Sequence, residues 1–235
     1  MHINGLTRRL VQLYIGLALY GLSGALLVRS ELGLDPWDVL HQGIARHAGL
    51  AIGTVAIIVG AAVLLLWIPL RQLPGIGTIS NVVLIGVWMN ISLMWLPHVH
   101  HLPWRIADMV SGVALCGVAT GLYIGAHFGP GPRDGLMTGL ARKTGRSIRF
   151  TRTLLEATVL VTGWFLGGTV GIGTVLFAVS IGPLAQLFMR IFDVSPVRGP
   201  RHLHEPATSP TDPPESRNPG TGRRMSVAAR RATRG

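Results

Sequence analysis

Two stretches of the chain decide its expected architecture: Leu32-Gly-Leu-Asp-Pro-Trp-Asp38 and Phe128-Gly-Pro-Gly-Pro-Arg-Asp134, which lie 96 residues apart. The same shift places Gly75-Ile-Gly-Thr78 on Gly171-Ile-Gly-Thr174. Between residues 16 and 90, about 25 of 75 positions are identical to the residue 96 positions further on. Shared apolar composition does not align Pro, Asp and a Gly-Ile-Gly-Thr string, so the sequence predicts an internal duplication.

The composition is that of a membrane protein with a polar tail. Of 235 residues, 49% are hydrophobic and 13% are charged, against about 25% charged in soluble domains. A single Cys excludes a disulfide scaffold and a Cys-based zinc module. Of the +11 net charge, +4 lies in the segment 193–235, which contains eight Arg, four acidic residues and few large apolar residues. Because such a segment cannot bury enough surface to fold, we expect a disordered basic tail.

Six segments are long and apolar enough to cross a bilayer, which needs about 20 residues. Their approximate bounds are 10–28, 52–70, 76–96, 106–126, 150–168 and 171–192. The sequence therefore predicts an all-α polytopic membrane domain over 1–192, with one repeat at about 8–96 and the other at about 104–192. Between the first two spans of each repeat, residues 38–48 and 134–144 measure roughly 17 Å as helices. They are too short to cross and are expected to be interfacial or re-entrant.

Three spans in each half place the second half upside down relative to the first, which is the inverted-repeat plan of many secondary transporters. With both termini in the cytoplasm, Lys and Arg before the tail number ten on the inner side and three on the outer side. This asymmetry favours that orientation. It places the Asp35–Asp38 stretch outside and its counterpart at Arg133 and Asp134 inside.

Asp35-Pro36-Trp37-Asp38 is typical of a helix start, with Asp35 as the N-cap and Pro36 in the first turn. The second copy keeps Pro132 and Asp134. One interpretation is a cap on an interfacial helix. The other is that both short helices re-enter the membrane and direct their N-termini at a shared pathway, which makes Asp38 and Asp134 candidates for gating or ion contact.

The two Gly-Ile-Gly-Thr strings stand at the start of the third span of each half. Their glycines permit a tight turn and close packing, and their threonines are expected to cap the following helix. The alternative is that free N–H groups there meet an anionic ligand. The residues concerned are Gly75, Gly77 and Thr78 in the first half, and Gly171, Gly173 and Thr174 in the second.

Glu156 is the deepest carboxylate of the predicted spans. Arg152 lies four residues earlier on the same helix face, so pairing is one interpretation and a proton or substrate role is the other. Three clustered His near residue 100 are interpreted as a solvated loop, and no metal or cofactor is expected. The tail is expected to contact anionic lipid rather than nucleic acid, because no aromatic residues accompany its charge.

Gly33-x-Asp35-Pro36-Trp37-Asp38, the Gly-Ile-Gly-Thr strings and the span layout resemble the YczE/YyaS/YitT family of bacterial integral membrane proteins, and within that family YczE most. The similarity covers most of residues 8–192 and leaves out the tail. It implies a multi-pass protein of the bacterial inner membrane and a transporter-like role. It supplies no site residues.

Two classes of function remain from the sequence. The first is a transporter or exporter of a small solute, favoured by the inverted duplication. The second is a non-transporting accessory or scaffold protein for a partner enzyme or complex. No enzymatic activity is expected, because neither the H-E-x-x-H nor the G-x-S-x-G motif is present. A polar cavity flanked by Asp38, Asp134 and Glu156 would favour transport, and a sealed apolar interface would favour the partner role.

Overall fold

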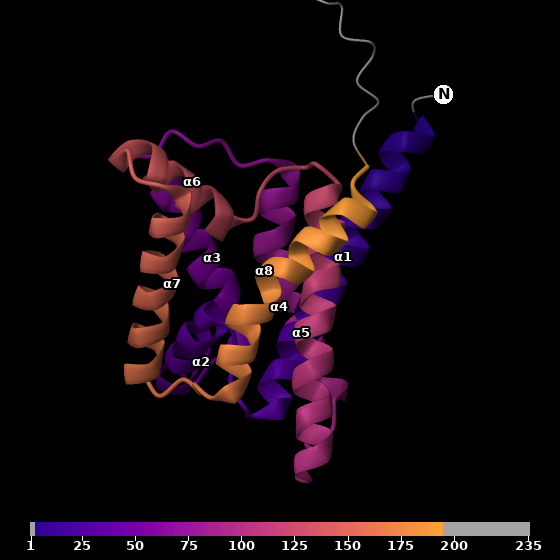
Figure 1. Cartoon of the computed structure of the whole chain (residues 1–235), viewed down its shortest axis with the longest axis vertical. Coiled ribbons are helices and arrows are strands. Elements are labelled where there is room, and N and C mark those ends of the chain that lie inside the picture. The colour runs from indigo at the N-terminus through magenta and orange to yellow at the C-terminus, as the bar shows by residue number, and fades with distance from the viewer. Residues whose placement is uncertain (1–2, 195–235) are drawn as a thin grey trace, which may run out of the picture. The chain divides into compact units, whose positions relative to one another are not determined.

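The computed structural model describes residues 3–194, which form eight α-helices and no strand (Figure 1). In chain order these helices are α1 (Ile3–Ser30), α2 (Pro36–Ala48), α3 (Ile52–Trp67), α4 (Ile76–Trp95), α5 (Leu102–Gly125), α6 (Pro132–Thr144), α7 (Ile148–Phe165) and α8 (Ile172–Phe192). Each of the six predicted apolar segments overlaps one of the six longer helices. Of the tail predicted at 193–235, residues 195–235 lie outside the described part of the chain.

The helix boundaries repeat at the spacing found in the sequence. The short helices α2 and α6 have 13 residues each and begin 96 positions apart. The helices α3 and α7, and likewise α4 and α8, also begin 96 positions apart. Both short helices start two residues earlier than expected, because Pro36 and Pro132 occupy the first helical turn.

Four helices are long and apolar enough to cross a membrane: α1 from Gly5, α4, α5 and α8. The helix α3 has only 16 residues, and it follows α2 across a bend of 113°. Counting α2 and α3 together as one broken span gives a fifth. The helix α7 has 18 residues but includes three charged ones: Arg149, Arg152 and Glu156. By length and composition alone, four or five spans are therefore candidates, and the count of six stays a prediction.

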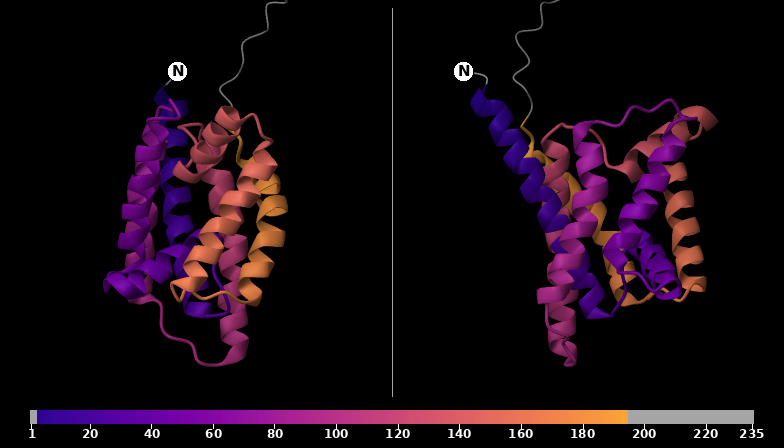
Figure 2. Two further views of the ribbon diagram at one scale, coloured as in Figure 1. Left: turned by 90° about the vertical axis from the view of Figure 1, so that its left-hand side faces the viewer. Right: turned by 180° about the vertical axis from the view of Figure 1, so that it is seen from behind.

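The long helices run along one common direction, and the short helices lie at opposite ends of the bundle (Figures 1 and 2). The helix α1 packs against α4 and α5, and α5 packs in turn against α8. The helix α2 packs against α7, and α6 packs against α3. Each short helix therefore lies against the second long helix of the opposite half.

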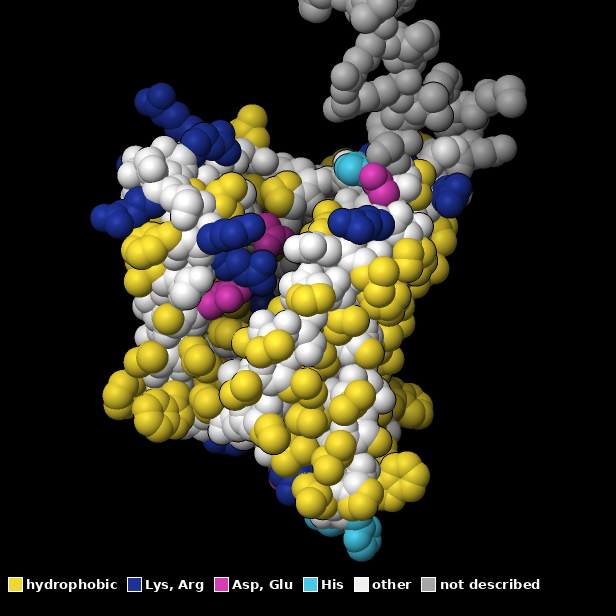
Figure 3. Space-filling model, viewed as in Figure 1, with side chains coloured by type: hydrophobic (Ala, Val, Ile, Leu, Met, Phe, Trp, Pro, Cys, Tyr) yellow, Lys and Arg dark blue, Asp and Glu magenta, His cyan; other side chains and the backbone are white. Residues whose placement is uncertain are grey.

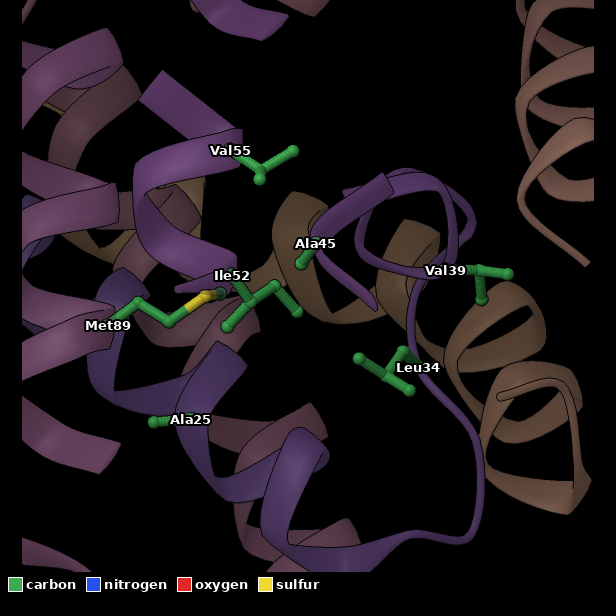
Figure 4. Close-up of a cluster of buried hydrophobic side chains, with 7 residues drawn as sticks. All are labelled: Ala25, Leu34, Val39, Ala45, Ile52, Val55 and Met89. Atoms are coloured by element: carbon green, nitrogen blue, oxygen red, sulfur yellow. The ribbon is translucent and has the colours of Figure 1, made fainter. Parts of the chain in front are cut away.

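A buried apolar cluster anchors α2 in the interior of the bundle (Figure 4). Val39 and Ala45 of α2, with Leu34 just before it, lie among side chains from α1, α3 and α4. Val39 and Leu34 have no exposed surface. Burying a side chain of this size stabilises a fold by roughly 1.5–3 kcal/mol. The position of α2 is thus fixed by packing inside the protein.

Two equivalent glycines allow the halves to cross closely in front of α2 and α6. Gly33 has φ +123° and Gly129 has φ +119°, a conformation that glycine adopts without strain. A Cβ on Gly33 would lie 2.8 Å from the Gly171 nitrogen, and one on Gly129 would lie 2.9 Å from Thr78 Oγ1. Each glycine thus faces the Gly-Ile-Gly-Thr string of the other half.

Backbone hydrogen bonds join the halves at the same crossing. The Gly173 N–H donates to the Leu32 carbonyl at 2.8 Å, and the Gly77 N–H donates to the Phe128 carbonyl at 3.0 Å. Gly77 is equivalent to Gly173, and Leu32 is equivalent to Phe128, each pair lying 96 residues apart. The two bonds are therefore equivalent, with the donor and the acceptor coming from opposite halves in each. The glycine-containing strings therefore hold the halves together, and these two N–H groups already have backbone acceptors.

Candidate functional site

The N-terminus of α2 is capped by a buried carboxylate. Asp35 Oδ1 accepts hydrogen bonds from the Trp37 N–H at 2.8 Å and the Asp38 N–H at 2.9 Å. These bonds satisfy two of the N–H groups that a helix start leaves without an intrahelical partner. In α6 the corresponding position is Gly131, which offers no capping side chain.

Arg133, at the start of α6, joins the two helix starts. Its Nη1 lies 3.5 Å from Asp35 Oδ1, and its Nη2 lies 3.8 Å from Asp38 Oδ1. Its guanidinium carbon lies 5.1 Å from the centre of the Trp37 ring. The expectation that the two motifs face opposite compartments is therefore wrong, because they meet inside the protein. The reason is that α2 and α6 turn inward, so the long Arg133 side chain reaches two carboxylates of the other half.

Two further carboxylate contacts complete this polar centre. Asp38 Oδ1 lies 2.9 Å from His41 Nδ1, and both side chains are buried. The Tyr123 hydroxyl donates to Asp134 Oδ2 at 3.0 Å, and the Tyr123 ring packs edge-to-face on Tyr20, with 6.0 Å between ring centres.

Sequence reasoning missed three residues of this centre: Arg133, His41 and Tyr123. His41 stands three positions after Asp38, a spacing that lets two side chains meet on a helix. In the second copy, Arg133 stands at the position equivalent to Trp37. This change from an aromatic to a cationic side chain was the feature of the sequence that could have identified Arg133. Nothing in the sequence pattern singled out Tyr123, because it lies in an apolar helix.

Two cavities lie on either side of this centre. The large cavity, of about 240 Å³, is walled by α7 and α8, and the small cavity, of about 80 Å³, is walled by α3 and α4. Five residues line both cavities and separate them; we call them the septum: Tyr20, Trp37, Tyr123, Arg133 and Asp134.

The outer walls of the two cavities are equivalent in sequence. Five wall residues of the small cavity correspond, after a shift of 96, to five of the large cavity. In the small cavity these are Ala56, Gly60, Asn81, Ile85 and Gly86, and in the large cavity Arg152, Glu156, Phe177, Ile181 and Gly182. The duplication has thus produced two versions of one site, of which the second carries the charge.

The two cavities differ in volume because α3 and α4 pack closely against each other, whereas α7 and α8 do not. In the α3–α4 pair, Asn90 Oδ1 accepts from the Gly53 N–H at 2.9 Å and Asn90 Nδ2 donates to Thr54 Oγ1 at 3.1 Å. Within residues 3–192, α7 packs against α2 and α6 but makes no extensive contact with α8. Figure 3 shows a hollow between α7 and α8, with acidic and basic side chains gathered around it.

The structure separates the predicted site residues into three groups. Six line the large cavity: Asp35, Pro36, Trp37, Asp134, Arg152 and Glu156. Arg152 Nε donates to Glu156 Oε1 at 2.8 Å. Pro132 lines the small cavity, and Asp38 lies behind the wall of both. The six residues of the Gly-Ile-Gly-Thr strings line neither cavity and serve the crossing of the halves.

No group of three His, Cys, Asp or Glu side chains within residues 3–194 is arranged to hold a metal ion. The polar groups of this centre instead pair with one another: Arg133 with Asp35 and Asp38, and the Tyr123 hydroxyl with Asp134. The arrangement places the fixed charges of Asp35, Arg133 and Asp134 on the wall of the large cavity.

The outer surface identifies the class of protein. Many large apolar side chains are exposed on the long helices, including Leu65 at 66%, Val179 at 70% and Trp95 at 84%. Soluble monomers rarely carry apolar surface of this extent, and tryptophan near a helix end is typical of a membrane interface. With four or five possible spans, the chain is a polytopic α-helical membrane protein.

The particular family follows from comparison with known sequences. Residues 7–190 match the Family of unknown function (DUF6198), and the chain belongs to this family. It is 41% identical over 179 residues to an "Uncharacterized protein" of Haemophilus influenzae, covering 76% of this chain and 82% of that protein. It is 35% identical over 171 residues to the "Uncharacterized membrane protein YczE" of Bacillus subtilis, covering 72% of this chain and 80% of YczE.

A third relative, "Uncharacterized protein YyaS" of Bacillus subtilis, is 27% identical over 183 residues, covering 76% of this chain and 91% of YyaS. The resemblance to a YczE-like family is thereby confirmed. No solved structure matches the chain.

Proposed function

We propose that the protein is a transporter or exporter of a small solute, built from two inverted repeats of three spans and one re-entrant helix each. Two observations support the inversion. The backbone bonds at the crossing exchange the two halves, which indicates a two-fold relation. The helices α2 and α6 lie at opposite ends of the bundle, which favours a two-fold axis in the plane of the membrane (Figure 1).

The observation that carries the proposal is the pair of equivalent cavities of unequal size. In inverted-repeat transporters, alternating access arises when one repeat rocks against the other around a central site. Here the α3–α4 pair is closed and the α7–α8 pair is open, with the septum between them. If the two pairs exchanged their conformations, the open cavity would pass from one side of the septum to the other.

The charge distribution supports an orientation with both termini in the cytoplasm of a bacterial inner membrane. The helix α1 begins and α8 ends at the same end of the bundle, where α6 meets α7 (Figure 1). The segment from Arg142 to Arg149 at that end carries four basic residues. In this orientation the basic tail leaves at the cytoplasmic surface, where anionic lipid would attract it.

A cross-linking experiment tests alternating access directly. Gly53 and Gly86 touch in the closed α3–α4 pair, and their equivalents are Arg149 and Gly182 in the open pair. In a Cys116→Ala background, we expect the double variant Arg149→Cys/Gly182→Cys to form a disulfide when α7 closes on α8. The same cross-link should raise the labelling rate of Ala56→Cys, which lines the small cavity, by a membrane-impermeant maleimide. The control carries Arg149→Cys and Ala56→Cys without Gly182→Cys, so it cannot form the disulfide.

The opposite outcome would favour the accessory or scaffold role. If the disulfide does not form in native membranes, and Ala56→Cys labels at one slow rate under all conditions, the two helix pairs do not exchange. The cavities would then be fixed features of a protein that does not transport.

A further inference from the structure

The wall of the large cavity carries more acidic than basic side chains. Three carboxylates line it, from Asp35, Asp134 and Glu156, against the two guanidinium groups of Arg133 and Arg152. Both Arg are already paired: Arg152 with Glu156, and Arg133 with Asp35. Arg133 also lies near the buried Asp38, so a further negative charge stands directly behind the wall.

Asp134 is the acidic side chain of this wall that forms no ion pair within residues 3–194, and Arg133, the preceding residue, acts on it only at longer range. No nitrogen of Lys, Arg or His in residues 3–194 lies within 4.0 Å of its carboxylate oxygens, and its hydrogen-bond partner is the neutral Tyr123 hydroxyl. Asp134 is half-buried, and a carboxylate that is partly removed from bulk water is stabilised by a nearby cation. Because Asp134 lines both cavities, a cation bound there would stand at the point that alternating access must expose to each side.

The rest of the wall suits an organic cation better than a hydrated metal ion. The rings of Tyr20, Tyr123 and Phe177 line the cavity, and aromatic faces attract ammonium groups within about 6 Å. Apolar side chains fill much of the remaining surface: Met137, Ile181, Ala185 and Met189. The volume of about 240 Å³ is below the roughly 300 Å³ at which pockets for drug-sized ligands begin. The cavity therefore favours a small ligand.

We infer that the large cavity binds a small organic ammonium ion, with its charge against Asp134 and its alkyl groups against the aromatic rings. This rests on the proposed function in one respect, namely that the cavity is the site of the transported solute. It adds the substrate class and the residue that recognises the charge.

The test is ligand binding to the purified full-length protein in detergent. Choline chloride and tetramethylammonium chloride are titrated calorimetrically, with sodium chloride at equal ionic strength and sodium gluconate as controls. We expect saturable binding of both ammonium ions and none of gluconate. Asp134→Asn should weaken binding by about tenfold or more, since a charge-assisted contact is lost. Asp134→Glu should retain most of it.

The matched control is Glu31→Gln, which removes a carboxylate that is largely exposed and does not line the large cavity. It should bind both ammonium ions as the wild type does. Size-exclusion profiles and thermal unfolding identify variants that fail to fold. The wild-type titration remains decisive even if Asp134→Asn does not fold.

Three results would overturn the inference: no saturable ammonium binding by the wild type, preferential binding of gluconate, or equal ammonium affinity in folded Asp134→Asn. Uptake of radiolabelled choline or gluconate into proteoliposomes separates this failure from failure of transport. Choline binding without choline uptake would contradict the transporter and leave the cation site standing. Uptake of gluconate alone would contradict the cation site and leave the transporter standing.

Discussion

Trp37 and Arg133 occupy the same position in the two halves of the chain, 96 residues apart, and they stack on each other with 5.1 Å between the guanidinium carbon and the ring centre. When two halves are related by a two-fold axis, equivalent residues can touch each other only close to that axis. Trp37 and Arg133 therefore lie near it. Their difference in chemistry makes the contact attractive, since a cation faces an aromatic ring instead of a second cation. The contact also brings Arg133 to the carboxylates of α2.

The first prediction concerns this arginine. Arg133→Met leaves Asp35 and Asp38 without their cation, and removing one partner of a buried ion pair is strongly destabilising. Because the Arg133 side chain is 25% exposed, we expect a loss of about 2–3 kcal/mol in the free energy of unfolding, somewhat less than the roughly 3–5 kcal/mol of fully buried pairs. Unfolding by SDS in mixed micelles measures it. The double variant Asp35→Asn/Arg133→Met should recover part of the loss, and a single variant as stable as the wild type would contradict the ion pairing.

The second prediction compares two equivalent glycines. A Cβ on Gly86 would collide with the Gly53 carbonyl, whereas a Cβ on Gly182 would meet nothing within 4 Å. Gly86→Ala should therefore lose about 1–3 kcal/mol of unfolding free energy through overpacking. Gly182→Ala should lose less than Gly86→Ala, because no other helix meets its Cβ and the cost is confined to the contact with Pro183, the next residue of α8. Thermal unfolding of both variants in the same detergent measures the difference. Equal losses of unfolding free energy would show that α7 and α8 are as close as α3 and α4.

The third prediction tests the crossing of the halves at Thr78, which has no exposed surface. Its hydroxyl donates to the Pro130 carbonyl at 2.7 Å and accepts from the Gly75 N–H at 3.3 Å. Thr78→Val keeps the shape but loses both bonds, which costs about 1–3 kcal/mol when buried groups are left unpaired. Thr78→Ser keeps the hydroxyl and should lose less. The measurement compares the melting temperatures of the two variants. If Thr78→Val and Thr78→Ser melted at the same temperature, the hydroxyl bonds would not contribute to stability.

The fourth prediction concerns topology. Leu50 and Arg146 are equivalent residues that follow α2 and α6, and both are exposed. In a Cys116→Ala background, Leu50→Cys and Arg146→Cys should react with an impermeant maleimide from opposite sides of the membrane, because inversion places equivalent turns in opposite compartments. Labelling of right-side-out and inside-out vesicles measures this. Reaction of both from the same side would exclude an inverted repeat.

The sequence predicted the helices well because their signals are local. Apolar runs, prolines in the first turn and the 96-residue shift place all eight helices to within a few residues or, for α1 and α5, a turn or two. The number of spans is less secure. Arg149, Arg152 and Glu156 lower the hydropathy of α7, and α3 is short because α2 before it is already inside the protein.

The candidate site was predictable in part. Asp134 was singled out by the repeated helix-start motif, and Arg152 and Glu156 as charges inside an apolar segment; all three line the large cavity. The contact between Arg133 and the α2 carboxylates was not predictable, since it depends on how far α2 and α6 turn inward. The same is true of Tyr123, whose hydroxyl meets Asp134 only through the packing of α5 beside α6.

The exchanged bonds at the crossing have a consequence for the origin of the chain. Gly77 to Phe128 and Gly173 to Leu32 are the contacts that a lone four-helix unit would form with a second, oppositely oriented copy of itself. A primitive unit of this kind would be complete only as an antiparallel homodimer with dual insertion. Under the proposed inverted repeat, fusion of the two gene copies would have freed them to diverge, to Arg152 and Glu156 in one half and to Ala56 and Gly60 in the other.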